Sequence, residues 1–174
     1  PAALTLLADP TTTDNLKSYA ATVVRDVGNT EHRRQLAQSW AALPEISNNL
    51  LGCLCEALFP QAIAVDELLA LLRRSHTIGR YRHDLPYVIR PLLKRELDAS
   101  KAEELLWGLL ELLVTPPLMD RLKLSEQFLW LTSLIPACLQ HLLAEATPSD
   151  KAYDLATDAI LLLEQVEWHG HLDW

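Results

Sequence analysis

The C-terminal segment 168–174 holds the one local group of metal-ligating residue types in the chain. His169, His171 and Asp173 alternate there, as ligands would in an extended segment. A metal ion needs three or four convergent ligands on a rigid support, whereas this segment lies at the end of the sequence. We therefore predict no metal site, and expect Trp168 and Trp174 to anchor the segment after a helix.

The three cysteines do not predict a metal site either. Cys53 and Cys55 are one residue apart, too close for an ordinary disulfide, and in a helix their side chains would diverge by about 200°. No second Cys or His pair has the spacing that completes a zinc site. We expect Cys53, Cys55 and Cys138 to be small buried apolar residues. An odd cysteine count also favours a reducing compartment, so we expect a cytoplasmic location.

The sequence lacks the motifs of common enzyme sites. It has five glycines and contains neither G-x-G-x-x-G nor the P-loop pattern, and His-Glu-x-x-His, Gly-x-Ser-x-Gly and paired Cys-x-x-Cys are also missing. Its carboxylates fall on expected helix faces and first turns, where solvation explains them. We therefore expect no cofactor and no intrinsic enzymatic activity.

A strongly basic stretch, residues 73–95, is called here the basic segment. It carries 7 basic residues and 1 acidic residue in a chain of net charge −8. Arginine beside tyrosine can hold phosphates and stack on bases, which would suit nucleic acid, but the acidic remainder of the chain disfavours a polyanion. We expect either pairing with the acidic helices that follow or a protein partner with an acidic surface. The candidate binding residues are Arg73, Arg74, Arg80, Tyr81, Arg82, Tyr87, Arg90 and Lys94.

A second candidate surface lies in the apolar stretch 128–144. Trp130, Leu134, Ala137 and His141 recur there at helical spacing, opposite a face formed by Phe128, Leu131, Ile135, Cys138, Leu139 and Leu142. Such a second stripe is either the contact to the next hairpin, which is more common, or a partner site formed by Trp130, Leu134 and His141. Polar residues within the stretch predict a buried helix, so no membrane association is expected.

Composition and helix caps predict an all-α protein. The chain is 49% hydrophobic and 22% charged, is rich in Leu and Ala, and shows hardly any alternation of the strand type. Helices are predicted over residues 14–27, 31–43, 45–59, 66–74, 87–97, 101–114, 125–146 and 149–167, with a loop over 78–85 and a short turn at 118–122. Helix 101–114 is apolar over more than half its circumference, so we expect neighbours on two sides.

Pairing these helices in chain order gives antiparallel hairpins that begin near residues 45, 86 and 125, at intervals of 41 and 39. Pro91 and Pro136 fall inside predicted helices, where proline produces a kink. In this spacing the chain resembles HEAT-like α-solenoids, a resemblance that implies stacked hairpins and an extended protein-binding surface. An irregular solenoid and a compact helical bundle both remain open.

The length of 174 residues predicts a single all-helical domain, 1–174, and the terminal residues Pro1 and Trp174 favour a fragment of a longer protein. The expected function is a non-catalytic protein–protein interaction or scaffold module. One alternative is a helical regulatory segment of a larger multidomain enzyme, such as a nucleotide-driven switch protein. A weaker alternative is a nucleic-acid-binding module that uses the basic segment.

Overall fold

The computed structural model describes residues 2–40, 43, 46–75, 85–113, 126–144 and 149–168. Within these ranges the chain is helical and has no strand, which confirms the all-α prediction. No helix in the described ranges combines the length and the apolar character needed to cross a membrane. The chain divides into two compact units, residues 1–92 and residues 93–174, here called unit 1 and unit 2.

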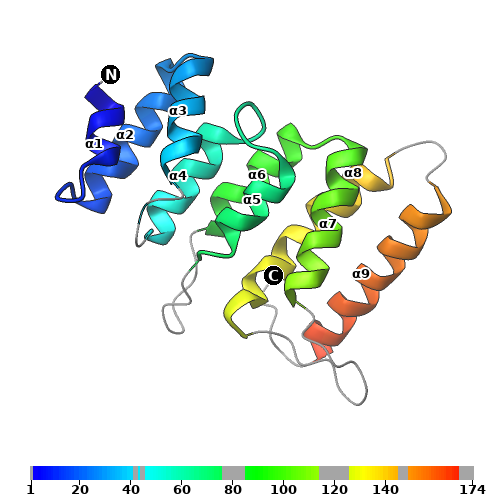
Figure 1. Ribbon diagram of the computed structural model, residues 1–174. Helices are drawn as coiled ribbons and strands as arrows, with labels where there is room; N and C mark the ends of the chain where they lie inside the picture. The colour runs from blue at the N-terminus through cyan, green and yellow to red at the C-terminus, as the bar shows by residue number, and fades with distance from the viewer. Residues whose placement is uncertain are drawn as a thin grey trace. The chain divides into compact units, whose positions relative to one another are not determined.

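Unit 1 begins with four helices that alternate between two layers (Figure 1). Its elements are α1 (Ala2–Ala8), α2 (Asp14–Val27), α3 (Thr30–Trp40), α4 (Asn48–Leu58), α5 (Val65–Leu72) and most of α6 (Leu85–Glu96). Helix α2 lies beside both α1 and α4, while α3 also contacts α1 and α4. The pairs α1/α3 and α2/α4 therefore form the two layers.

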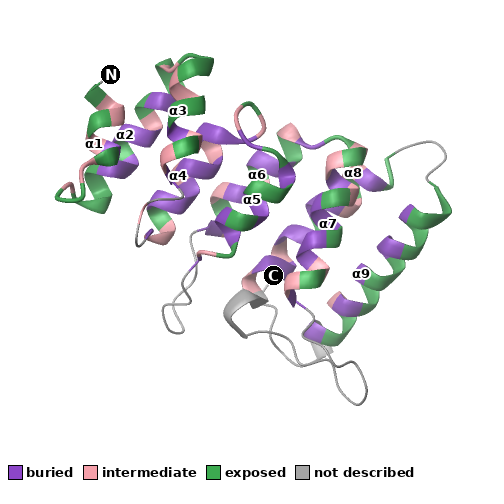
Figure 2. Ribbon diagram, in the orientation of Figure 1, coloured by how far each residue is buried: buried purple, intermediate pink, exposed green. Residues whose placement is uncertain are grey.

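Unit 2 is organised around α7 (Ala99–Leu113), which contacts its three described neighbours. These are the 3₁₀ helix η1 (Glu126–Leu134), α8 (Ile135–Leu142) and α9 (Asp150–Trp168). Contact with α8 and α9 confirms that α7 is covered by more than one helix. Leu105, Leu109 and Leu113 are fully buried, and in both units the buried residues follow one side of each helix (Figure 2).

Neighbouring helices cover less of the circumference of α7 than its apolar pattern predicted. Trp107 belongs to the predicted apolar arc, yet its side chain is 49% exposed. The outer side of α7 near Trp107 therefore faces solvent.

Side-chain caps explain where several helices start. Ser47 caps α4, because its Oγ accepts the Leu50 N–H at 3.3 Å, so the predicted start at residue 45 is wrong by three residues. Asp98 caps α7 through the Lys101 N–H (2.9 Å), so this helix begins two residues before the predicted start at 101. Ser149 caps α9 as predicted, with its Oγ accepting the Ala152 N–H at 3.2 Å. Helix α1 was not predicted, because segment 2–8 has no capping signal.

The predicted continuous helix 125–146 is wrong in its first half. Residues 126–134 form η1, and the α-helix begins at Ile135 with Pro136 in its first turn. Proline lacks an N–H and fits the first turn, where that donor would have no helical partner. Pro136 therefore starts α8 instead of kinking a longer helix, whereas Pro91 does lie inside α6.

These boundaries also change the hairpin spacing. Helices α4, α6 and α8 begin at residues 48, 85 and 135, so the intervals are 37 and 50 instead of 41 and 39. The predicted interval of about 40 residues between hairpins arose because the starts of α4 and α8 were placed too early, at residues 45 and 125. The order of helices in unit 1, and not this interval, is what resembles a stack of hairpins.

Candidate interaction surfaces

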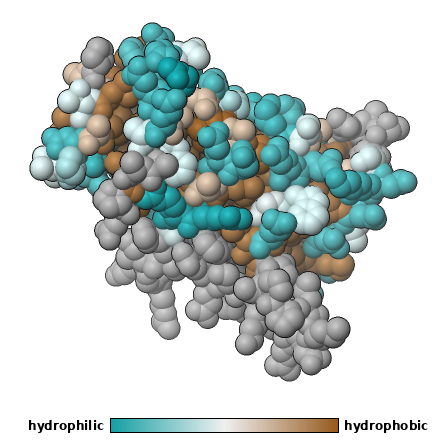
Figure 3. All heavy atoms as spheres, viewed as in Figure 1, coloured by the Kyte–Doolittle hydropathy of each residue, from teal (hydrophilic) through white to brown (hydrophobic). Residues whose placement is uncertain are grey.

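Helix α2 carries a row of large apolar side chains that face solvent, here called the α2 stripe. Leu16, Tyr19, Val23 and Val27 follow one another at intervals of three, four and four residues, so they share one helix face. Their exposed fractions are 44, 71, 49 and 78%. Single exposed apolar residues are ordinary, whereas four in one row form a patch. Figure 3 shows apolar residues at the surface over the N-terminal helices.

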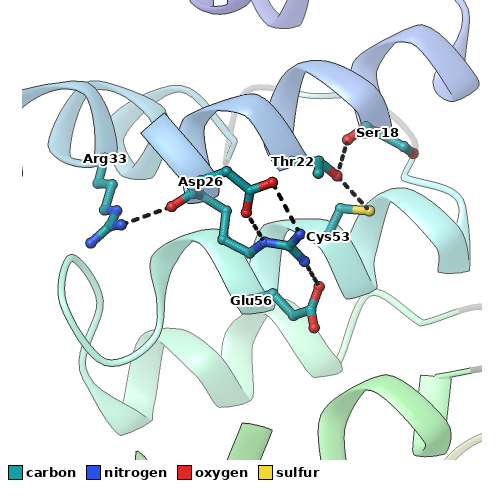
Figure 4. A network of polar contacts seen from close by, with 7 residues as sticks. Ser18, Thr22, Asp26, Arg33, Cys53 and Glu56 are labelled. Carbon is teal, nitrogen blue, oxygen red and sulfur yellow. Dashed lines mark hydrogen bonds and ion pairs between the residues drawn. The ribbon is translucent and has the colours of Figure 1, made fainter. Parts of the chain in front are cut away.

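The side of α2 away from this stripe is fixed to α4 by polar contacts, here called the α2–α4 seam. Its four pairs, with distances between 2.5 and 3.8 Å, are Asp14 with Ser47, Ser18 with Asn49, Thr22 with Cys53, and Arg25 with Glu56. Figure 4 shows the part of the seam around Thr22, Cys53 and Glu56. Residue numbers rise together along both helices, so α2 and α4 run parallel.

The seam determines the direction of the α2 stripe. At 100° per residue, the mean direction of the four α2 seam residues lies roughly 150° around the helix from the mean direction of the stripe. Ala20, Ala21 and Val24 fill the intervening buried side. The α2 stripe therefore points away from α4 and is held on a helix that is packed along the seam and along the side of Ala20, Ala21 and Val24.

The exposed face of α2 carries little charge. Asp26 is the ionisable residue beside the stripe, and its carboxylate accepts from Arg25 Nε at 2.7 Å. This hydrogen bond lowers the pKa of Asp26, so the carboxylate is negative at neutral pH. Asn15 is exposed on the same flank of the helix.

Basic side chains close the C-terminal ends of three helices. Arg33 Nη2 donates to the Arg25 carbonyl of α2 at 2.9 Å. Arg74 donates to the Trp40 carbonyl at the end of α3 (3.1 Å) and to the Leu43 carbonyl. His141 Nε2 contacts the Lys94 carbonyl in the last turn of α6 at 3.1 Å. The last carbonyls of a helix have no helical donor and carry partial negative charge, so side-chain N–H donors stabilise them.

The described residues of the basic segment have different environments. Arg74 is used inside unit 1, where it donates to the backbone carbonyls of Trp40 and Leu43. Arg73 and Lys94 are exposed and form no ion pair with a described residue. Tyr87 is 66% exposed and Arg90 is half-buried. Arg80, Tyr81 and Arg82 lie outside the described residues.

The second predicted surface is mostly enclosed. Leu134 and Ala137 are buried, with exposed fractions of 0 and 2%. Trp130 and His141 are half-buried, and His141 contacts the Lys94 carbonyl. A buried residue cannot line an open surface, so of this set only Trp130 and His141 reach solvent. The burial of Leu134 and Ala137 is expected if this stripe is the contact to the next hairpin.

Two of the three cysteines are fully buried, as predicted. Burial raises the pKa of the Cys138 thiol to about 12 and also raises the pKa of Cys55. The prediction of a buried Cys53 is wrong, because this residue is half-buried and accepts from Thr22 Oγ1 in the α2–α4 seam. In the described part of the chain, no three His, Cys, Asp or Glu residues form a group able to hold a metal. His169, His171 and Asp173 lie outside that part.

Unit 2 has a less continuous counterpart of the α2 stripe on α9. Tyr153, Ile160 and Leu161 are 53, 44 and 51% exposed. Asp154 and Asp158 are exposed between them and interrupt the apolar surface. The α2 stripe is thus the longer uninterrupted apolar row, and its 3-4-4 spacing was already legible in the sequence.

Comparisons with protein-family models, with curated proteins and with solved structures gave no match. The interpretation of these surfaces therefore rests on their own residues.

Proposed function

We propose that the protein is a non-catalytic protein–protein interaction module that binds its partner through the α2 stripe. The observation that carries this proposal is the row of four exposed apolar residues on one face of α2. Tyrosine is among the residue types enriched at interface hot spots, and burying the apolar surface of Leu and Val at an interface is also favourable.

The packing of α2 supports the same proposal. The α2–α4 seam and the Arg33 bond to the Arg25 carbonyl hold α2 from the side and from its end. A surface on a well-held helix loses little conformational freedom when it binds, so less of the interaction energy is offset by ordering. A helix face of this kind fits an apolar helix or groove of the partner.

We also infer that unit 1 is a short stack of helical hairpins, closer to the HEAT-like solenoid than to a bundle. Parallel α2 and α4 support this arrangement, since equivalent helices of successive hairpins run parallel in a stack. Arg74 follows α5 and bonds the C-terminal end of α3, so these two helices also end on the same side. Stacks of this kind commonly serve as binding scaffolds.

The test compares partner recovery by the tagged protein and two double variants. Val23→Glu with Val27→Glu places charge in the α2 stripe, and Ile160→Glu with Leu161→Glu is the matched change on exposed residues of α9. Both should change the free energy of unfolding by less than about 0.5 kcal/mol. We expect specific partners to be lost with the first variant only. Equal recovery by both variants would overturn the proposal.

A second candidate partner is an acidic protein bound by the basic segment. It is favoured by Arg73 and Lys94, which are exposed without an ion pair to a described residue. Charge reversal by Lys94→Glu should then slow association, and added salt should weaken binding of the unchanged protein. Titration with a single-stranded oligonucleotide at low ionic strength tests the nucleic-acid alternative, for which affinity should fall steeply with salt.

A further inference from the structure

We propose that the α2 stripe binds the α2 stripe of a second copy of this chain, with the two helices antiparallel around a two-fold axis. This inference rests on the proposed function, because it names the partner of the same surface. A two-fold interface uses one patch twice, so residue i of one copy contacts residue j of the other, and j contacts i. The α2 stripe meets this requirement.

The spacing of the stripe is nearly unchanged when the helix direction is reversed. Leu16 and Val27 lie at its ends, and Tyr19 and Val23 lie inside them. With the two-fold axis near residue 21, Leu16 faces Val27 of the other copy and Tyr19 faces Val23. All four side chains of each copy then meet an apolar side chain. Pairs of this type, one aromatic with one β-branched, pack closely at helix contacts.

The polar flank of α2, formed by Asn15 and Asp26, can also pair with the same flank of the second copy in this arrangement. Reversal about residue 21 places Asn15 of one copy within about 1.5 Å of the height of Asp26 of the other, on the same side of the contact. Asn15 is exposed, and the side chain of Asp26 is 54% exposed despite its bond to Arg25. An amide N–H of Asn15 can therefore donate to the Asp26 carboxylate across the interface.

Like charges are kept apart by this pairing. The two Asp26 carboxylates would be about 14 Å apart along the helix direction, beyond the screening length of about 8 Å at physiological ionic strength. The dipoles of the two antiparallel helices also oppose each other, which is favourable. A parallel pairing would provide neither the Asn15–Asp26 contact nor this dipole arrangement.

The size of the contact predicts weak association. From Leu16 to Val27 the stripe is about 16 Å long, about three helical turns. Two helices in contact over this length bury less surface than the roughly 1,200 Å² at which stable complexes begin. We therefore expect a dissociation constant of roughly 10 µM to 1 mM. The dimer should therefore form and dissociate readily.

Sedimentation of the full chain between about 10 µM and 1 mM tests self-association. We expect the mean mass to rise toward that of a dimer, to stay monomeric for Val23→Glu, and to rise unchanged for the control Ile160→Glu. Circular dichroism checks that each variant is folded. A monomer throughout the range, or an equal rise for Val23→Glu, would overturn the inference. If the chain is monomeric but partner recovery still depends on the stripe, only this inference fails and the proposed function stands.

Cross-linking tests the direction of the two helices. Leu16→Cys and Val27→Cys chains, both carrying Cys53→Ser, are treated with a short bismaleimide, separately and as an equal mixture. The antiparallel pairing predicts several-fold faster cross-linking in the mixture than in either separate sample. Faster cross-linking of Leu16→Cys with itself would indicate parallel helices, and equal rates in all samples would indicate random collision. Either result would overturn the inference.

Discussion

Arg74 lies over the ring of Trp40, with its guanidinium carbon 5.6 Å from the ring centroid, while its Nη1 donates to the carbonyl of the same tryptophan. One side chain thus covers the aromatic ring and satisfies the end of α3. Sequence reasoning had placed Arg74 among the residues for an external partner. Its planar guanidinium suits both contacts, because it can stack on a ring and donate along its edge.

Arg74→Ala should lower the free energy of unfolding by about 1–3 kcal/mol, because it removes a cation–π contact and hydrogen bonds from a charged donor. The free energy of unfolding of Arg74→Lys should lie between those of the unchanged protein and Arg74→Ala, since an ammonium keeps the charge but cannot reproduce the planar contact. Denaturant unfolding measures both. Arg73→Ala is the control, because Arg73 is exposed, and its effect should stay below about 0.5 kcal/mol. Similar losses at both positions would contradict this role of Arg74.

Leu109→Ala and Leu113→Ala should each cost about 2–5 kcal/mol of unfolding free energy, since both side chains are fully buried on α7. Chemical denaturation of the single variants provides the measurement. The exposed Glu111 on the same helix is the control, and Glu111→Ala should have little effect. Losses below about 1 kcal/mol at both leucines would show that α7 is not central to unit 2.

Gly52→Ala should stabilise the protein by about 0.5–1 kcal/mol, because glycine inside a helix is entropically unfavourable. A methyl group at this position would lie 3.5 Å from Val88 Cγ1 and 3.6 Å from Leu85 Cδ2, which are ordinary van der Waals distances. Thermal unfolding should show a higher midpoint. At Gly28, by contrast, a Cβ would lie 2.2 Å from the Val24 carbonyl oxygen, so Gly28→Ala should destabilise the end of α2. Destabilisation by Gly52→Ala would contradict the packing described for α4.

Asp98 should make stability depend on pH through its cap of α7. Hydrogen bonds from the Lys101 side chain and backbone lower the pKa of Asp98. Its contribution is therefore present above the unfolded pKa of about 3.9 and is lost as pH falls through the lower folded value. Asp98→Asn keeps a capping side chain without this titration, and Asp98→Ala should cost about 1 kcal/mol at neutral pH. The stability difference between the unchanged protein and Asp98→Asn should shrink at acid pH, and a constant difference would contradict the assignment.

Thiol labelling of the folded protein should modify Cys53 before the other two cysteines. Cys53 is half-buried, whereas Cys55 and Cys138 are enclosed and burial raises the pKa of both. Near neutral pH we expect one thiol to react at an observable rate and the other two to react only on unfolding. Cys53→Ser should remove the fast phase. Fast labelling of Cys138 in the folded protein would contradict its burial.

The sequence alone determined the helical character of the chain and several helix limits. Leucine-rich 3.6-residue periodicity and local caps are short-range properties, so segment 14–27 and the Ser149 cap were predicted correctly. The same rules placed the start of α4 at residue 45 and a long helix over 125–146, because they cannot rank one cap or proline position against another. That choice depends on the packing of each segment.

Only the tertiary structure decided which polar and apolar residues are used internally. Arg74 was predicted to bind an external partner and His141 to belong to an apolar stripe, but each contacts a carbonyl at the end of a neighbouring helix. Arg33, for which the sequence predicted no role, does the same at the end of α2. The α2 stripe has a legible spacing, yet that spacing equally fits a buried face. Its exposure follows from the α2–α4 seam, which turns the stripe away from α4, and contacts across about 31 residues of sequence cannot be derived from local pattern.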